Sequence, residues 1–535
     1  MKPNHAILRG QIFLLGPIVL LAILTLVAFV TRPLTPIDET RYIGVAWEMW
    51  LKNDYLVLFK NGAPYSDKPP LLFWIYNLGW AVFGVNEWWP RLVSPLFSLG
   101  ALLLTLSLGR RLWPDDEGAR RNAAWILSSC LLWMLFSTSA MFDVMLTFFV
   151  LLGLRGLLMA AAGARQRGFA WLAVAIGCGV LAKGPVVLLH LLPVAALVPW
   201  WQPGVNGKRW AGGVLLAVLG GAAIALAWAI PAAIAGGEEY RRMIFWGQTA
   251  GRVANSFAHK RAFWWYLPLL PALLFPWLLW PGFWRRCLAL RAEGLDHGLR
   301  FCLAWSLPVF FVFSLISGKQ VHYLVPLLPA FALLTGRLLA REQPGGGGAG
   351  GGIWLPALLV AAAGAAMIGL APDGLADRLG PSISLPRWPG AALILAALAA
   401  VWLGRRAEQR VAALAVLGAA FFVLAQFYVA DYLWLHYDVR PMAQEIARLQ
   451  QGGVALGKKG EYNNQYRFFG RLERPIDELP TPADIQSWFA QHPDGILLAE
   501  GAPRPGETPL FSHPYRQETA LLLDAAQARA RGWLK

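Results

Sequence analysis

Three charged side chains stand together in TPIDETRYIG, residues 35–44, directly after the first long apolar run of the chain. Asp38 and Glu39 are carboxylates, which can take a proton from a hydroxyl or orient a cationic group. A carboxylate at the edge of a membrane is costly unless it is paired or hydrated. The alternative role is structural, because Asp38 would also serve as the cap of the amphipathic helix that follows.

A further carboxylate, Asp143 in SAMFDVMLTFF, comes at the start of another apolar run, where it could equally cap a helix. Basic residues recur in the segments expected on the same side, namely Lys68, Lys183, Lys260, Arg261 and Lys319, with Tyr323 close to the last. Lysine binds phosphate as a point charge, and arginine binds it through parallel N–H groups. Together they predict a polar cavity for a phosphate or diphosphate whose lipid tail lies in the bilayer. Each basic residue taken singly could instead be a membrane-surface anchor.

Lys68 precedes Pro69 and Pro70, and a residue before proline is kept out of the α region. Its backbone is therefore expected in an extended turn that aims the ammonium group. Its neighbour Asp67 and the distant His259 carry ligand types that divalent metals accept. A divalent metal is the only cofactor that we predict from the sequence.

Composition decides the broad class of the protein. Hydrophobic residues make up 57% of the 535 positions, charged residues only 15%, and the mean hydropathy is +0.47, which indicates a polytopic membrane protein. Apolar runs of about 17–25 residues predict membrane spans. We predict thirteen, at 11–30, 91–109, 121–137, 143–162, 169–182, 185–201, 210–231, 263–284, 301–317, 322–337, 353–371, 389–404 and 411–430. The apolar stretch 71–83 is too short to span and predicts a re-entrant or interfacial helix.

The distribution of Lys and Arg supports this assignment, because cytoplasmic loops carry an excess of both. Alternate loops hold them, so the N-terminus is predicted to be cytoplasmic and everything after Ala430 external. The first span is expected to be a retained anchor, since no small-residue cleavage site follows it. The net charge of +16 follows from these loops, so we infer no nucleic-acid partner.

From about Asp438 the composition becomes more polar, with frequent Pro and Gly. Residues 442–451 and 483–492 predict amphipathic helices, while 495–500 and 520–526 predict short strands or helix segments. The expected fold class is an all-α polytopic membrane protein with a small C-terminal external α/β domain. Its predicted parts are a transmembrane catalytic domain, 1–435, with a long first external loop, 31–90, and a periplasmic domain, 436–535.

Several motifs occur together in order: DETRY at 38–42, DKPPLLFW at 67–74, GVNEWWPRL at 84–92, FDVMLTFF around Asp143, LAKGP around Lys183, AHKRAFWWYLP and SGKQVHYLVPLLP. As a set they resemble GT-C fold glycosyltransferases that take sugars from polyprenyl-phosphate carriers. The resemblance is strongest to the bacterial enzymes that transfer 4-amino-4-deoxy-L-arabinose from undecaprenyl phosphate to lipid A. Protein O-mannosyltransferases are more distantly similar.

The resemblance implies that Asp38 is the principal catalytic carboxylate, with Glu39 and Asp143 nearby. It also implies that Lys68, a basic residue of 259–261 and Tyr323 grip the carrier phosphate. This chain departs from many aminoarabinose transferases in having Asp67 where they carry Glu before Lys-Pro-Pro. Their Ser-x-Leu-Pro-x-Tyr segment is also replaced by SGKQVHY, which adds Lys319 and His322 and leaves the donor and acceptor open.

The predicted function is inverting transfer of a sugar from undecaprenyl phosphate to lipid A or lipopolysaccharide, at the periplasmic face of a bacterial inner membrane. Asp38 would act as a general base toward a hydroxyl acceptor, or would orient a cationic group if the acceptor is a phosphate. Another envelope glycan or a protein could be the acceptor. A lipid flippase would use the same basic cavity, but the inverted repeats typical of transporters are not evident. A scaffold whose external domain binds envelope partners would leave the clustered charges unexplained.

Overall fold

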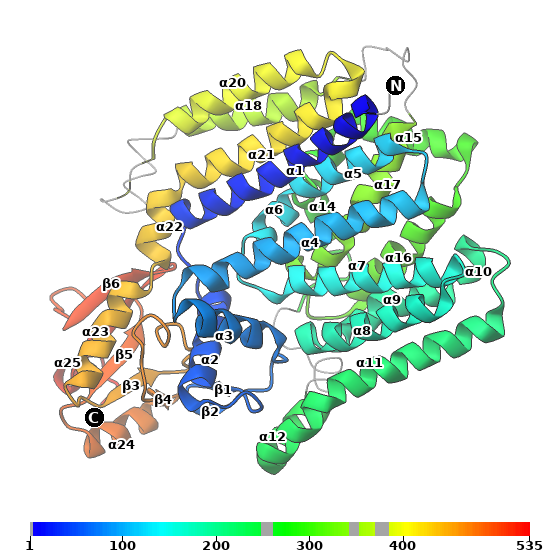
Figure 1. The fold of residues 1–535 in the computed structure, drawn as a ribbon. Coiled ribbons are helices and arrows are strands. Elements are labelled where there is room, and N and C mark those ends of the chain that lie inside the picture. Colours follow the sequence, from blue (N-terminus) through cyan, green and yellow to red (C-terminus); the bar gives the residue numbers. More distant parts are fainter. Residues whose placement is uncertain (1–3, 248–259, 342–351, 370–382, 384, 535) are drawn as a thin grey trace.

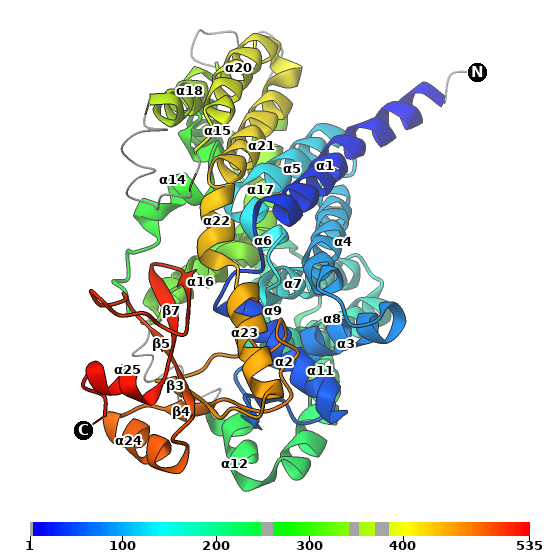
Figure 2. The ribbon, with the colours of Figure 1, turned by 90° about the vertical axis from the view of Figure 1, so that its left-hand side faces the viewer.

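The chain folds into a bundle of helices with a small sheet at one end (Figure 1). The computed structural model describes residues 4–247, 260–341, 352–369, 383 and 385–534. The long helices run side by side, and the sheet packs beside the short helices of the first predicted external loop (Figures 1 and 2). The expected all-α bundle with a C-terminal α/β part is therefore confirmed.

The bundle helices follow the apolar runs of the sequence. They are α1 (Asn4–Thr31), α4 (Trp88–Leu112), α5 (Glu117–Ser129), α6 (Leu131–Ser137), α7 (Phe142–Ala161), α8 (Arg165–Lys183), α9 (Val186–Ala196), α10 (Val198–Trp201), α11 (Gly207–Ala235), α15 (Pro281–Glu293), α16 (His297–Leu315), α17 (Leu328–Ala340), α18 (Trp354–Gly369), α20 (Trp388–Leu403) and α21 (Arg410–Tyr428). Helices α7 and α8 pack most extensively. Glycine permits this approach, since a Cβ on Gly156 would lie 2.6 Å from the Gly168 carbonyl oxygen.

Among the described residues, six helical segments are long and apolar enough to cross a membrane. These are Trp88–Leu112, Phe142–Ala161, Gly207–Ala235, His297–Leu315, Val321–Ala340 and Ala407–Tyr428. The predicted count of thirteen is not confirmed, because several apolar runs are short or interrupted. The run 121–137 breaks at Cys130, and 263–284 divides into η2 (Leu267–Leu269), α14 (Leu270–Leu273), η3 (Trp277–Leu279) and the start of α15. Prolines at 268, 271, 276 and 281 account for the second interruption.

The first predicted external loop contains two helices and a small hairpin. They are α2 (Asp38–Lys52), β1 (Phe59–Lys60), β2 (Ala63–Pro64) and α3 (Leu71–Phe83). The predicted helix at 71–83 is thus confirmed. Beyond α11 the chain turns into α12 (Gly237–Arg242) and the π-helical η1 (Met243–Gly247). The Tyr240 hydroxyl accepts from the Leu58 amide at 3.2 Å, so α12 holds the residue that directly precedes β1 of the hairpin.

The C-terminal part is reached through α22 (Ala430–Tyr437) and α23 (Arg440–Gln451). Its other elements are β3 (Leu456–Lys459), β4 (Asp477–Leu479), α24 (Pro482–Gln491), β5 (Ile496–Glu500), β6 (Phe511–Tyr515), β7 (Glu518–Leu523) and α25 (Ala525–Ala530). The sheet order is β4-β3-β5-β7-β6, with β3 parallel to both neighbours and β7 antiparallel to both of its own. The predicted helices are confirmed, 495–500 contains strand β5, and 520–526 contains the end of strand β7 and the start of α25.

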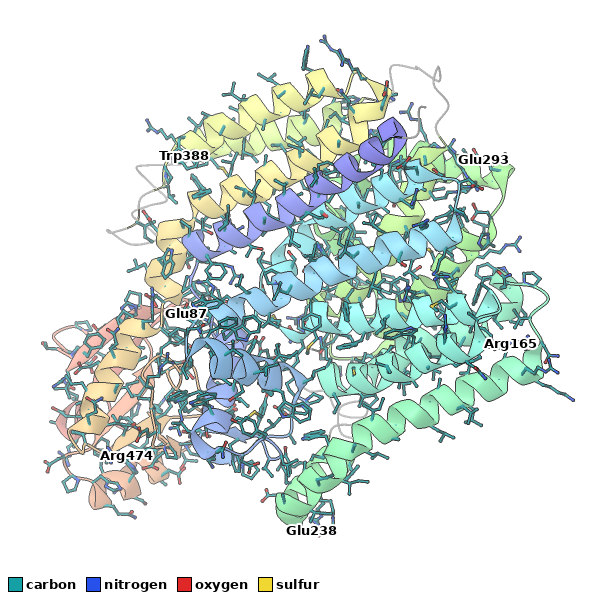
Figure 3. The ribbon with its side chains drawn as sticks, in the orientation of Figure 1. Glu87, Arg165, Glu238, Glu293, Trp388 and Arg474 are labelled. Atoms are coloured by element: carbon teal, nitrogen blue, oxygen red, sulfur yellow. The ribbon has the colours of Figure 1, made fainter. Side chains whose placement is uncertain are left out.

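Charged side chains mark the two ends of the bundle (Figure 3). Arg165 and Glu293 lie at the end where the loops were predicted to be cytoplasmic, while Glu87 and Arg474 lie at the opposite end, beside the sheet. Asp38 and Glu39 belong to this second end, since helix α2, on which they lie, contacts the C-terminal part. The fold therefore gathers them where helices α2, α7 and α8 begin or end.

Candidate functional site

Asp38 is the first residue of α2, and one of its two carboxylate oxygens is held by the next helical turn. Oδ1 forms an ion pair with the Arg41 guanidinium and accepts a hydrogen bond from the Tyr42 hydroxyl at 3.3 Å. Within the described part of the chain, Oδ2 has no hydrogen-bond partner, and the side chain is 43% exposed. The carboxylate is thus fixed through one oxygen while the other can meet a substrate.

Burial raises the pKa of Tyr42, and the negative charge of Asp38 raises it further. The phenol therefore keeps its proton and remains a donor to Asp38. Its ring packs edge-on against Phe142 with centroids 4.8 Å apart, and Phe73 of α3 completes the cluster. Because Phe142 precedes Asp143, these rings join the start of α2 to the start of α7.

Glu39, one residue along, has a very different environment. Its carboxylate is buried and accepts from Arg32 Nη1 at 2.8 Å, the Thr35 amide at 2.9 Å and the Ala140 amide at 2.6 Å. Burial would raise the pKa of Glu39, but Arg32 and these hydrogen bonds outweigh it and lower the pKa. All this geometry serves to tie α2 to the turn before α7. The structure places Glu39 in a clamp that orients its neighbours rather than open to substrate.

Asp143 is buried at the start of α7 and forms an ion pair with Lys183 at the end of α8. The Lys183 ammonium also lies over the Tyr323 ring, 5.5 Å from its centroid. Three of the predicted site residues, from three separate elements, are therefore in direct contact. The pairing makes Asp143 the counter-ion of a lysine.

His322 links this group to Asp38. It lies in η4 (Val321–Leu327), where its ring is 4.8 Å from that of Tyr323. The charges of Asp143, Lys183, Asp38 and Lys68 all act on its imidazole. Two acidic and two basic residues of the predicted site are therefore near enough for their charges to influence one imidazole.

The other predicted residues differ in how far they are buried. Asp67 is exposed and Lys68 half-buried in the turn before α3, whereas Lys260 and Arg261 are exposed. Lys319 is buried, and its ammonium donates to the carbonyls of Arg261, at 3.1 Å, and Ile316. The Lys319 ammonium is therefore bonded to main-chain carbonyls, and the bond to Arg261 joins the segment 316–319 to the segment 260–261.

His259 lies outside the described residues. Within the described ranges, no three His, Cys, Asp or Glu side chains gather closely enough to hold a metal ion. The metal at Asp67 and His259 therefore stays a prediction.

Sequence reasoning missed Arg32, the partner of Glu39, and Asn463, whose side-chain oxygen accepts from Arg41 Nη1 at 3.2 Å. Arg32 carries a detectable signal, because it is a basic residue on the side where the positive-inside rule disfavours one. Asn463 carries none, since it belongs to no recognisable motif and lies far along the chain.

The fold is similar to that of solved GT-C structures. The chain aligns with the crystal structure of ArnT from Cupriavidus metallidurans bound to undecaprenyl phosphate, with a TM-score of 0.72 at 20% identity, over 96% of this chain and 98% of that chain. The oligosaccharyltransferase of Archaeoglobus fulgidus in the apo form gives a TM-score of 0.54 at 10% identity, over 92% and 69%. The fold predicted from the motifs is confirmed.

Sequence comparisons point to the same group of proteins. Residues 67–234 match the model of the dolichyl-phosphate-mannose-protein mannosyltransferase family. The undecaprenyl phosphate-alpha-4-amino-4-deoxy-L-arabinose arabinosyl transferase 2 of Pseudomonas fluorescens is 35% identical over 323 residues, which are 57% of this chain and 55% of that protein. The match thus spans about half the length of the curated relatives. The resemblance seen in the motifs is borne out by these similarities.

Proposed function

We propose that the protein is an inverting glycosyltransferase that moves 4-amino-4-deoxy-L-arabinose, or a related sugar, from undecaprenyl phosphate to lipid A. The observation that carries the proposal is the arrangement at Asp38. One oxygen is fixed by Arg41 and Tyr42, and the other has no hydrogen-bond partner among the described residues. The Tyr42 ring packs against Phe142, which precedes Asp143, and Asp143 pairs with Lys183, whose ammonium lies over the Tyr323 ring. The similarity to named aminoarabinose transferases and to ArnT bound to undecaprenyl phosphate supports the choice of donor.

In the proposed reaction the acceptor oxygen attacks the anomeric carbon as the bond from that carbon to the phosphate oxygen breaks. The phosphate leaves with the bonding electron pair, and we assign the stabilisation of its charge to Lys68, Lys183 and Tyr323. The Lys183 ammonium lying over the Tyr323 ring supports this assignment. A hydroxyl acceptor would give its proton to Oδ2 of Asp38. A phosphate acceptor is already ionised, and Asp38 would then orient the amino group of the sugar.

The membrane setting is part of the proposal. We place the N-terminus in the cytoplasm, the C-terminal part in the periplasm and the site at the periplasmic face of a bacterial inner membrane. The thirteen-span arrangement, the domain boundary near residue 435, the lipid A acceptor and a divalent metal at Asp67 and His259 belong to the same proposal. Chelation of divalent metals during transfer tests the last point.

The test is mass spectrometry of lipid A and lipopolysaccharide from cells that carry the wild type, the Asp38→Asn variant or neither. We expect a mass increment of one sugar residue with wild type alone, and its size gives the composition of the sugar. An increment that persists in Asp38→Asn would overturn the role of Asp38. Identical spectra in all three strains would overturn lipopolysaccharide as the acceptor.

A further inference from the structure

The C-terminal part contacts the first predicted external loop through a buried polar centre. Glu48 of α2 is fully buried and accepts from the backbone amides of Asn61, at 2.6 Å, and Gly62, at 2.8 Å. It also accepts from the Asn464 side-chain amide at 2.8 Å, while Arg467 lies 3.5 Å away. One carboxylate therefore joins α2, the hairpin and the segment 461–476, and such a buried charge requires these partners to stay in place.

Additional contacts make this interface specific. The Asn61 side chain exchanges two hydrogen bonds with the backbone of Ile476, at 2.7 and 2.9 Å. The rings of Trp80 and Phe468 stack with an interplanar angle of 5°. A Cβ on Gly44 would lie 2.8 Å from the backbone oxygen of Asn464, so only glycine lets α2 approach this closely. The segment 461–476 is thus fitted against α2 along several turns.

This interface reaches the candidate site at Asn463. The Asn463 side-chain oxygen accepts from Arg41 Nη1 at 3.2 Å, while Nη2 of the same guanidinium pairs with Asp38. The side-chain oxygen of Asn463 must face Arg41. If the amide were reversed, its NH2 group would point at the guanidinium, which has only N–H donors. The Asn463 backbone amide donates to the buried Gln465 side chain at 3.1 Å, which holds the loop.

We propose that Asn463 is a positioning residue and that the C-terminal part completes the site by orienting Arg41 toward Asp38. A guanidinium is planar, so fixing one N–H direction fixes the others. With Asn463 in place, one orientation of the Arg41 guanidinium lets it donate to both Asn463 Oδ1 and Asp38 Oδ1. That orientation also holds Asp38 Oδ1. This inference rests on the proposed function insofar as it concerns turnover; the geometry of Arg41 does not depend on the identity of the sugar.

The first experiment measures transfer by the full-length protein in lipid nanodiscs, with undecaprenyl-phosphate 4-amino-4-deoxy-L-arabinose as donor and lipid A as acceptor. Asn463→Ala should lower kcat roughly tenfold, the effect of losing one charge-assisted hydrogen bond, with little change in KM for the donor. Asn463→Asp retains an acceptor oxygen and should keep most of the wild-type kcat. Glu461→Ala is the matched control, because it removes an exposed pair with Lys60 from the same interface and should leave kcat unchanged.

A second readout follows the guanidinium itself. Phenylglyoxal modifies arginine side chains, and peptide mass spectrometry gives the rate at Arg41. We expect Asn463→Ala to raise that rate severalfold, and Asn463→Asp and Glu461→Ala to leave it near the wild-type rate. These measurements also show whether a low kcat accompanies general unfolding, since unfolding would raise the rates at all buried arginines together.

Wild-type kcat in Asn463→Ala, or an unchanged Arg41 modification rate, would overturn the inference. A fall in kcat together with faster modification confined to Arg41, both restored in Asn463→Asp, would support it. If the wild-type protein transfers nothing from this donor to lipid A, the proposed donor or the proposed acceptor is wrong. In that case the Arg41 modification rates still decide whether Asn463 orients the guanidinium.

Discussion

Asp38 and Glu39 are adjacent carboxylates with opposite environments. Asp38 is 43% exposed and engages Arg41 through one oxygen, whereas Glu39 is 2% exposed and is surrounded by Arg32 and two backbone amides. Successive residues of an α-helix point about 100° apart, so neighbours in sequence face different surroundings. Charge at the edge of an apolar run therefore serves two purposes here, with Glu39 fixing the helix on which Asp38 is presented.

The largest expected effect is on catalysis. Asp38→Asn keeps the size of the side chain and removes the charge and the proton acceptor, so transfer should fall at least about 100-fold. Its pair with Arg41 is partly exposed and asparagine keeps an acceptor oxygen for the guanidinium, so the thermal stability should change by only about 1 kcal/mol. Turnover and the melting temperature of the purified protein measure the two quantities. A stable variant with wild-type turnover would remove the distinction between the two carboxylates.

Glu39→Gln should lower the stability of the protein strongly, whereas Asp38→Asn should mainly lower turnover. Arg32 would keep its charge in a buried position without a counter-ion, which costs about 3–5 kcal/mol and should lower the melting temperature markedly. Combining it with Arg32→Met removes the unpaired charge and should recover part of the loss. If Glu39→Gln alone melts like the wild type, Glu39 does not clamp α2.

The pH dependence of stability also tests whether the charged carboxylate of Glu39 stabilises the fold. The pKa of Glu39 is lowered in the folded protein, so this carboxylate contributes stability at pH values above its unfolded pKa, about 4.3. That contribution is lost as the pH falls through the lowered folded pKa. Melting temperatures measured from pH 6 down to pH 3 should therefore decline more steeply for the wild type than for Glu39→Gln. Parallel curves would contradict the assignment.

The smallest effect is expected at the exposed pair of Lys60 and Glu461, 2.7 Å apart. Such surface pairs contribute about 0.2–1 kcal/mol. Lys60→Gln should leave turnover unchanged and lower the melting temperature by no more than a few degrees. A large loss in either quantity would show that the surface of this interface matters as much as its buried centre at Glu48.

Much of the fold follows from local sequence, because apolar runs and periodicity are properties of short segments. The helix at 71–83 was predictable for this reason, whereas 495–500 could be predicted only as a strand or a helix segment and is a strand. The break of 263–284 was missed, although its prolines disfavour a continuous helix. The site was predictable in its residue types, but the different roles of Asp38 and Glu39 depend on Arg32 and Ala140, which only tertiary packing brings near. Asn463 could not be found, since an isolated asparagine in a loop has no distinctive pattern.

The contact between Arg41 and Asn463 joins residues 422 positions apart in the chain. Ribosomes add roughly 5–20 residues per second, so roughly 20–80 seconds pass between synthesis of the two. During that interval α2 exists without the segment that orients its guanidinium. A truncated or still-growing polypeptide that lacks Asn463 therefore carries Arg41 and Asp38 without the contact that ties them to the last fifth of the chain.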